Sequence, residues 1–238
     1  MYPHYICDKM IADNIVTEFD RFSNNYTDDM IRCVPHYKKL VASLVKYLPN
    51  DLNPHDILDL GSGNGNTMSA YYEHFPRSKY TLVDISPEMH RICRERFPTA
   101  DISSVKEFFK DLQFDKESFD VALASFSLHH IDAEEKKQLF HKIFEWLRPG
   151  GVFCYSDQMI DKTNPAYPEI LKDWKSFVVG NYKSTEKWDW LMEHHAAFDI
   201  PNDYTKQINW LVEAGFHEVE IPWREECWTN IRALKKSG

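Results

Sequence analysis

Residues 56–65 read DILDLGSGNG, a short apolar run followed at once by glycines at three alternate positions, Gly61, Gly63 and Gly65. Glycines in this arrangement let the backbone turn tightly and let a ligand lie against it without a clash with Cβ atoms. A helical pattern begins at residue 66, so the glycines join a strand to a helix, the context in which such a turn binds ligands. The spacing G-x-G-x-G is shorter than the dinucleotide fingerprint G-x-G-x-x-G, which favours a ligand without phosphates.

Two acidic residues beside the glycines narrow the class of ligand. Asp84 ends the next apolar run, about 20 residues after the turn, where a carboxylate accepts hydrogen bonds from ribose hydroxyls. Asp59 adds negative charge at the turn itself, which repels a phosphate and suits an ammonium or sulfonium group. Adenosine joined to a cationic amino acid satisfies these conditions.

The middle of the chain alternates short apolar runs with longer amphipathic stretches, which predicts βαβ units and a doubly wound parallel sheet of the α/β class. The expected strands cover residues 57–60, 80–83, 121–124, 152–155, 219–221 and 229–234. The expected helices cover residues 8–22, 28–48 with an interruption near Pro35, 66–75, 87–97, 133–147 and 204–214.

The stretch from about 156 to 203 has no strand periodicity and holds several tryptophans among polar residues. We expect a helical insertion there that closes over the ligand as a lid. The sequence thus suggests an N-terminal helical cap over 1–50 and a ligand-binding domain over 51–238.

Composition excludes several classes of protein. The 28 Lys and Arg residues against 37 Asp and Glu give a net charge of -9, whereas a nucleic-acid binder normally carries a basic excess or stripe. The apolar stretches fall short of the ~20 residues that a membrane span needs. The 5 cysteines are scattered without a CxxC pair, which predicts reduced thiols rather than disulfides or a zinc cage. We therefore expect a cytoplasmic protein that binds neither nucleic acid nor membrane.

Four segments resemble the class I S-adenosylmethionine-dependent methyltransferases: ILDLGSGNGNT (57–67), TLVDISPEM (81–89), FDVALASFSLHHI (119–131) and LRPGG (147–151). The resemblance implies a Rossmann-like sheet of seven strands whose last strand inserts antiparallel, with S-adenosylmethionine as the cofactor. It also implies a set of cofactor-binding residues. These candidates are Asp59, Gly61, Ser62, Gly63, Gly65, Asp84 and Ile85.

A narrower resemblance reaches both ends of the chain. FDRFSNNYTDDMIRCVPHYKKLV (19–41) and WLVEAGFHEVEI (210–221) are similar to the branch that contains the carboxy-S-adenosylmethionine synthases and nearby small-molecule methyltransferases. In that branch the positions matching Tyr37 and Ser125 reach the cofactor. The synthases hold the transferred carboxylate with an arginine in the late insertion. The matching stretch here, 186–189, contains none, which puts carboxyl transfer in doubt.

Two further cofactor contacts are less sharply indicated. The family's adenine-contacting acid falls near Glu107, Phe108, Phe109 and Asp111, and we take Asp111 as the candidate. Arg32 suits the cofactor carboxylate as a bidentate donor, with a surface salt bridge as the alternative.

His129 and His130 are the candidate catalytic residues. We expect them to end the fourth strand, at the edge of the sheet where ligands bind, and histidine titrates near neutrality as a general base must. Alternation along a strand would point only one of them into the pocket. Because strand neighbours cannot converge on one ion, no metal site is expected. His194 and His195 are expected at the surface.

Aromatic residues in the last third are candidates for contact with the substrate, because aromatic faces favour flat or cationic ligands. Core or lid packing is the alternative for each of them. The substrate-binding candidates are Trp174, Tyr182, Trp188 and Trp223.

The sequence therefore predicts in-line methyl transfer from S-adenosylmethionine to a small molecule, by a monomer or homodimer. Three alternatives stay open: synthesis of a carboxylated cofactor, methylation of RNA, and binding of S-adenosylmethionine without catalysis.

Overall fold

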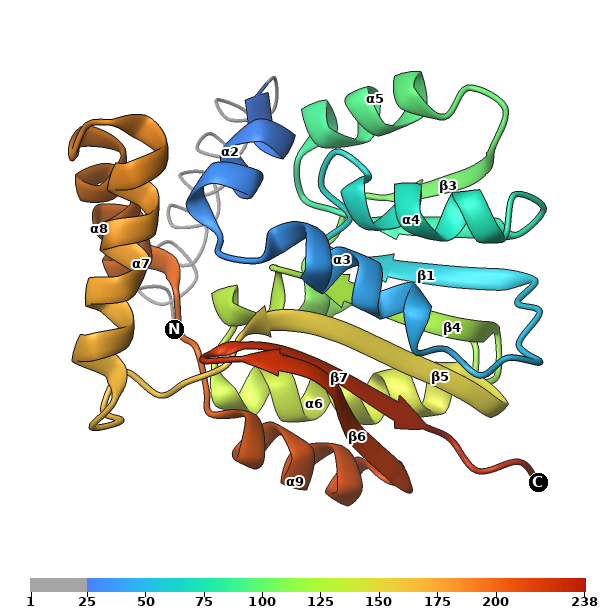
Figure 1. The fold of residues 1–238 in the computed structure, drawn as a ribbon. Helices are drawn as coiled ribbons and strands as arrows, with labels where there is room; N and C mark the ends of the chain where they lie inside the picture. Colours follow the sequence, from blue (N-terminus) through green and yellow to red (C-terminus); the bar gives the residue numbers. More distant parts are fainter. Residues whose placement is uncertain (1–24) are drawn as a thin grey trace, which may run out of the picture.

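The computed structural model describes residues 25–238, and the helix expected over 8–22 lies outside them. Seven strands form one sheet in the order β3-β2-β1-β4-β5-β7-β6 (Figure 1). They are β1 (Asp56–Leu60), β2 (Lys79–Val83), β3 (Asp101–Val105), β4 (Phe119–Ser125), β5 (Leu147–Gln158), β6 (Glu218–Glu225) and β7 (Trp228–Leu234). Strands β1 to β5 are parallel, and β7 inserts antiparallel between β5 and β6, which confirms the expected sheet.

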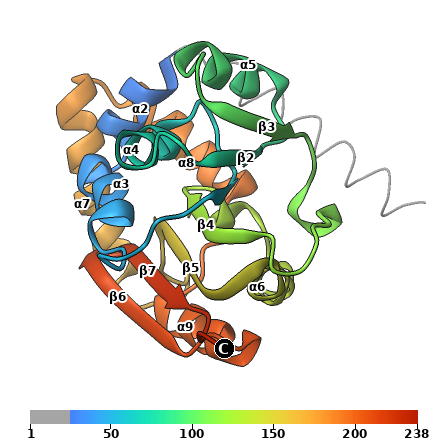
Figure 2. The ribbon, with the colours of Figure 1, turned by 90° about the vertical axis from the view of Figure 1, so that its right-hand side faces the viewer.

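Helices cover both faces of the sheet, as its apolar strands require. On one face, α3 (Tyr37–Lys46), α4 (Asn66–His74) and α5 (Pro87–Arg96) contribute to a buried apolar cluster. On the other face, α6 (Ala133–Trp146) and α9 (Tyr204–Ala214) contribute to a second cluster. Figure 2 shows α3 and α4 on one side of the sheet and α6 on the other.

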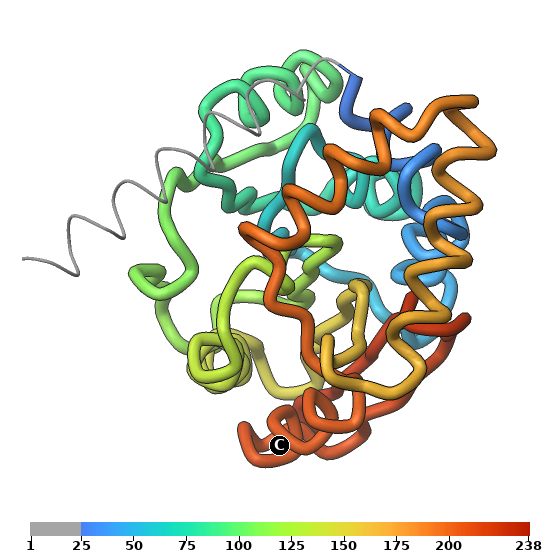
Figure 3. The backbone as a smooth tube through the Cα atoms, turned by 90° about the vertical axis from the view of Figure 1, so that its left-hand side faces the viewer, coloured from blue at the N-terminus to red at the C-terminus, as the bar shows by residue number. Residues whose placement is uncertain are grey.

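A third apolar cluster lies at the edge where the parallel strands end. It joins α2 (Tyr26–Cys33), α7 (Tyr167–Tyr182) and α8 (Glu186–Phe198) to the start of β7. Figure 3 looks at this end of the molecule, with α7 and α8 in orange in front of the strands. The helices expected within 156–203 are therefore present, and they lie over the edge of the sheet where doubly wound folds bind ligands.

The interruption expected near Pro35 is confirmed. Pro35 forces Val34 into an extended conformation and His36 then adopts a left-handed one, with φ of 61°, so α2 and α3 are separate helices. Strand β3 is not predicted by the sequence, because DISSV is an edge strand with two serines and only half-buried side chains. Within 25–238, no helix is long and apolar enough to cross a membrane.

Lys136 on α6 anchors the chain where it returns from α8 to the sheet. Its side chain is buried, and Nζ donates hydrogen bonds to the carbonyls of Ile131 and Ile200 and to Asn202 Oδ1, at 2.7–2.8 Å. One ammonium group thus joins the start of α6 to the segment just after α8.

We expect Lys136→Met to destabilise the protein by about 1–3 kcal/mol, because it removes these three hydrogen bonds and leaves their acceptors unpaired. The matched control is Lys137→Met, since the Lys137 side chain is 40% exposed and pairs with Glu134 at 3.7 Å. Urea unfolding of both variants measures the difference. Equal free energies of unfolding would show that Lys136 does not anchor this segment.

Candidate functional site

The glycine turn lies at the end of β1 and is held against the ends of β2 and β4. Gly61 and Gly63 have φ of 72° and 50°, in the left-handed region that glycine adopts without strain. The amide of Gly61 donates to the Val83 carbonyl at 2.8 Å. A Cβ atom on Gly61 would lie 2.2 Å from Ser127 Cβ, whereas among residues 25–238 one on Gly63 would meet only Tyr26, at 3.7 Å. Gly61 is therefore required by packing, and Gly63 borders more open space.

Both acidic residues expected beside the turn are there. Asp84 Oδ2 accepts a hydrogen bond from the Gly63 amide at 2.8 Å, and Oδ1 accepts one from the Ser86 amide at 2.9 Å. Asp59 is fully buried, and neither of its carboxylate oxygens has a hydrogen-bond partner among the described residues. Burial, with the charge of Asp84, raises the pKa of Asp59 to about 7. A buried carboxylate without a partner at the turn suits a ligand that brings a positive charge.

Other cofactor candidates surround the turn. The Tyr37 hydroxyl accepts a hydrogen bond of 3.0 Å from Asn66 Nδ2, directly after the glycines. Gly65 caps α4, and Ser62 is buried within the turn. The two remaining candidates lie at the ends of β2 and β4. Ile85 is half-buried after Asp84, and the Ser125 hydroxyl lies 3.1 Å from that of Ser156.

Two cofactor candidates are placed elsewhere. Arg32 lies 3.6 Å from Asp28, which is the surface salt bridge of the alternative interpretation. It also donates to the Asn181 carbonyl at 2.8 Å and lies 3.8 Å over the Tyr182 ring, so it joins α2 to α7. Asp111 is exposed at the end of a short 3-10 turn, whereas Phe109 in the same turn lies 3.6 Å from the Cβ position of Gly61. Arg96, which the sequence analysis missed, donates to the Asn64 carbonyl at 2.5 Å.

A cavity of about 110 Å³ adjoins the turn through Tyr26, and we call it the aromatic cavity. Its walls come from α2, α7, α8 and the ends of β4 and β5, so it is assembled from segments far apart in the sequence. The described residues that line it are Tyr26, Asp29, Met30, Cys33, Val34, Phe126, His129, His130, Gln158, Trp174, Lys187, Trp190, Leu191, His194, Asp199 and Trp228.

The two catalytic candidates both line this cavity, which corrects the expectation that only one would. Strand β4 ends at Ser125, and Phe126 turns the chain with φ of 53°. His129 and His130 then lie in a 3-10 turn, with ring centroids 4.0 Å apart. Strand alternation does not apply to such a turn, so the reason given against a metal site was also wrong.

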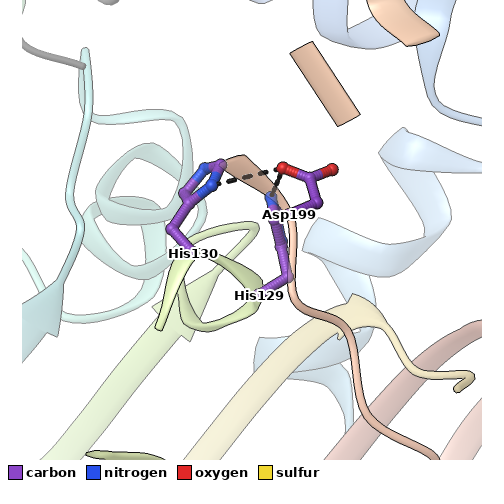
Figure 4. Close-up of side chains that lie close together, drawn as sticks. All are labelled: His129, His130 and Asp199. Carbon is purple, nitrogen blue, oxygen red and sulfur yellow. Dashed lines mark ion pairs between the residues drawn. The ribbon is translucent and has the colours of Figure 1, made fainter. Parts of the chain in front are cut away.

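Asp199, just after α8, faces this histidine pair (Figure 4). Its Oδ1 atom lies 3.3 Å from His130 Nδ1, 3.7 Å from His129 Nε2 and 3.8 Å from His194 Nε2. Burial opposes the charge on His129, but the carboxylates of Asp157 and Asp199 outweigh it and raise its pKa. Burial and the neighbouring His129 lower the pKa of His130.

His194 and His195 are buried, not at the surface as expected. Only 5% of the His195 side chain is exposed, and its Nδ1 lies 2.6 Å from Asp199 Oδ2. The His194 side chain is 13% exposed and lines the aromatic cavity. The sequence offers no signal for this arrangement, because the partner, Asp199, belongs to no motif.

The aromatic candidates divide between the cavity and its surroundings. Trp174 lines it and donates from Nε1 to the Cys33 carbonyl at 2.6 Å. Trp188 packs edge-on against Trp174 at 5.6 Å, and Tyr182 donates to Asp29. Trp223 lies 6.0 Å from the His36 ring. Four further aromatic residues of the cavity were not among the candidates: Tyr26, Phe126, Trp190 and Trp228.

Comparison with known proteins agrees with this geometry. Residues 57–151 match the family model described as methyltransferase domain. The chain is 24% identical over 222 residues to carboxy-S-adenosyl-L-methionine synthase of Campylobacter fetus, covering 90% of this chain and 91% of that one. It is 29% identical over 194 residues to demethylmenaquinone methyltransferase of Chlorobaculum tepidum, covering 79% and 76%. The chain is a class I S-adenosylmethionine-dependent methyltransferase.

Solved structures share the fold of this methyltransferase. Human N-acetylserotonin methyltransferase in complex with S-adenosylmethionine superposes with a TM-score of 0.62 at 17% identity. The match covers 93% of this chain and 57% of the human enzyme, so this chain spans a little over half of that protein. S-adenosylmethionine is the cosubstrate. The glycine turn, with Asp59 and Asp84 beside it, fits this ligand, because it offers glycine backbone and carboxylates to a molecule that carries no phosphate.

Substituting alanine for Gly61 and for Gly63 should show which glycine is required by packing and which by contact with the ligand. We expect Gly61→Ala to lower the melting temperature sharply or abolish folding, since its Cβ would overlap Ser127. Gly63→Ala should fold, with a free energy of unfolding lower by about 1–2 kcal/mol because alanine is strained in the left-handed conformation. It should also bind S-adenosylmethionine more weakly. Thermal melting and cofactor titration measure both effects. A Gly61→Ala protein that melts like the wild type would contradict the packing.

The raised pKa of Asp59 predicts a pH-dependent stability. Because the folded-state pKa of about 7 exceeds the ordinary value of 3.8 for an aspartate, the cofactor-free protein should lose stability as pH rises from about 4 to 7. Asp59→Asn should lack this loss, so the two free energies of unfolding diverge by up to about 4 kcal/mol. Urea unfolding between pH 4 and 8 measures it, with Asp101→Asn as the control. Parallel profiles for wild type and Asp59→Asn would refute the assignment.

Proposed function

We propose that this methyltransferase transfers the methyl group of S-adenosylmethionine to a small molecule bound in the aromatic cavity. The observation that carries the proposal is the position of the cavity. Tyr26 both lines it and lies closest to Gly63 of the glycine turn, so a ligand on the turn and a ligand in the cavity would be neighbours. A volume of about 110 Å³ suits a small acceptor or one end of a larger molecule.

In this proposal the residues around the glycine turn hold the cofactor. Asp84 accepts hydrogen bonds from its ribose, and Asp59 pairs with its positively charged amino acid part. Tyr37 and Ser125 border the same crevice. S-adenosylmethionine, when bound, supplies a methyl group already activated by the sulfonium. The chain therefore contributes chiefly alignment of the two ligands and exclusion of water, effects worth up to about 7–11 kcal/mol.

The walls of the cavity exclude water from the proposed site. Trp174 and Trp228 pack edge-on at 5.2 Å, and Lys187 lies 4.5 Å over the Trp190 ring. These rings exclude water and present flat apolar surfaces to an acceptor. We propose that the described part of the expected 1–50 cap, residues 25–50, caps this site and that 156–203 is its lid; residues 1–24 lie outside the described residues. His129 and His130 lie at the polar end of the cavity, where the reacting atom of the acceptor would be.

Three observations favour a small-molecule acceptor over RNA. The chain carries a net charge of -9, and the described cavity lining includes only one Lys or Arg, Lys187. A relative named demethylmenaquinone methyltransferase acts, by its name, on a small molecule. Strong and salt-dependent binding of RNA would argue against this choice.

Synthesis of a carboxylated cofactor is the second candidate. The relative named carboxy-S-adenosyl-L-methionine synthase matches this chain over 91% of the length of that synthase. Lys187 is the cation that could hold a carboxylate in the cavity, but it already pairs with Asp29 at 2.9 Å. Methyl transfer is therefore the better supported reaction. Mass spectrometry of the ligand that copurifies with the protein distinguishes the two.

The cofactor crevice is tested by titration calorimetry with S-adenosylmethionine. We expect Asp84→Asn to weaken binding at least tenfold, because it removes the charge that receives the ribose hydroxyls and the Gly63 amide. Asp101→Asn is the matched control, since Asp101 is exposed at the start of β3, whereas Asp84 follows the far end of the neighbouring strand β2. Equal affinities in wild type and Asp84→Asn would overturn the proposed crevice.

A further inference from the structure

We propose that His129, His130 and Asp199 form a zinc-type metal site at the polar end of the aromatic cavity. The three side chains come from the turn after β4 and from the segment after α8. Their donor atoms all lie within 4.8 Å of one another, and all three residues line the cavity (Figure 4).

The distances from Asp199 Oδ1 to the two histidine nitrogens fit ligands around one ion better than hydrogen bonds. Asp199 Oδ1 lies 3.3 Å from His130 Nδ1 and 3.7 Å from His129 Nε2, longer than ordinary hydrogen bonds. Ligands about 2.0–2.2 Å from a tetrahedral ion are roughly 3.3–3.6 Å from one another. Among the described residues, this buried oxygen has no hydrogen-bond partner. A buried carboxylate oxygen that faces imidazole nitrogens at this spacing is a ready metal ligand.

The groups behind the three ligands are those that orient metal ligands. His129 Nδ1 lies 2.5 Å from Asp157 Oδ1, which directs the other ring nitrogen toward Asp199. Asp199 Oδ2 receives hydrogen bonds from Gln158 Nε2 at 2.7 Å and from His195 Nδ1 at 2.6 Å, which leaves Oδ1 to face the histidines. Metal-bound histidines and carboxylates are generally held by such outer partners.

The donor set indicates the class of metal. Two imidazoles and a carboxylate suit Zn²⁺ and similar divalent ions, whereas Mg²⁺ and Ca²⁺ prefer all-oxygen sites. Three protein ligands leave a fourth position, as catalytic zinc sites do. His194 Nε2 lies 3.8 Å from Asp199 Oδ1, close to the same cluster.

The open position suggests what the ion would do. It faces the cavity, where an ion would bind the hydroxyl or thiol of an acceptor and stabilise its deprotonated form, with the proton lost to water. This role rests on the proposed function, whereas metal binding itself does not. Cofactor titration tests the function, and the experiments below need neither cofactor nor acceptor, so the two can fail separately.

Metal binding is measured on the full chain, purified without a histidine tag, by competition for Zn²⁺ with a chromogenic chelator. We expect one ion per chain, and affinity at least about 100-fold lower in His130→Asn and Asp199→Asn. In Asp157→Asn the affinity for Zn²⁺ should fall about 10–100-fold, because His129 is no longer held in the orientation that binds the ion. The matched control is His55→Asn, since His55 is 81% exposed beside the start of β1. Circular dichroism establishes that each variant is folded.

The wild type provides a test that no folding defect can affect. Replacement of Zn²⁺ by Co²⁺ should give the intense visible absorption of a four-coordinate ion. Absence of Zn²⁺ binding by the wild type would overturn the site. A weak six-coordinate Co²⁺ spectrum would do the same, as would affinity lost equally in His55→Asn. The cluster would then be a buried ion pair without a metal.

Discussion

A close contact between the first and fourth strands of the sheet governs the rest of this site. The Ser127 hydroxyl donates to the Leu60 carbonyl at 2.8 Å, and the space for this contact exists only because residue 61 is glycine. Ser127 also begins the turn that carries His129 and His130. The cofactor turn and the histidine pair are therefore placed relative to each other by one hydrogen bond and one missing Cβ atom.

The site contains buried carboxylates, which lower the stability of the folded protein. Asp59 lies buried at the glycine turn, and Asp157 and Asp199 lie buried among histidines. A carboxylate held away from water without full compensation is unfavourable, and such departures from good packing are typical of functional sites. In our proposals Asp59 faces the cofactor and Asp199 faces the metal, whereas Asp157 pairs with His129.

The two halves of the site differ in how they are encoded. The glycine turn and Asp84 follow two strands that are consecutive in the chain and paired in the sheet, β1 and β2. The aromatic cavity instead brings together α2, the ends of β4 and β5, α7 and α8. In the proposed function, this division separates the residues that hold the cofactor from the helices outside the sheet that receive the acceptor. Substitutions in α7 and α8 could therefore alter the acceptor without disturbing the cofactor.

The sequence alone determined the α/β sheet, the glycine turn, and Asp59 and Asp84 beside it, because apolar periodicity and a turn between adjacent elements are local properties. It did not reveal β3, whose serines lack an apolar pattern. Only the tertiary structure decided that both His129 and His130 face one cavity and that Arg32 joins two helices. It alone brought Asp199 to the histidines, since that meeting depends on how α8 folds back over the sheet, and no local pattern encodes such a contact.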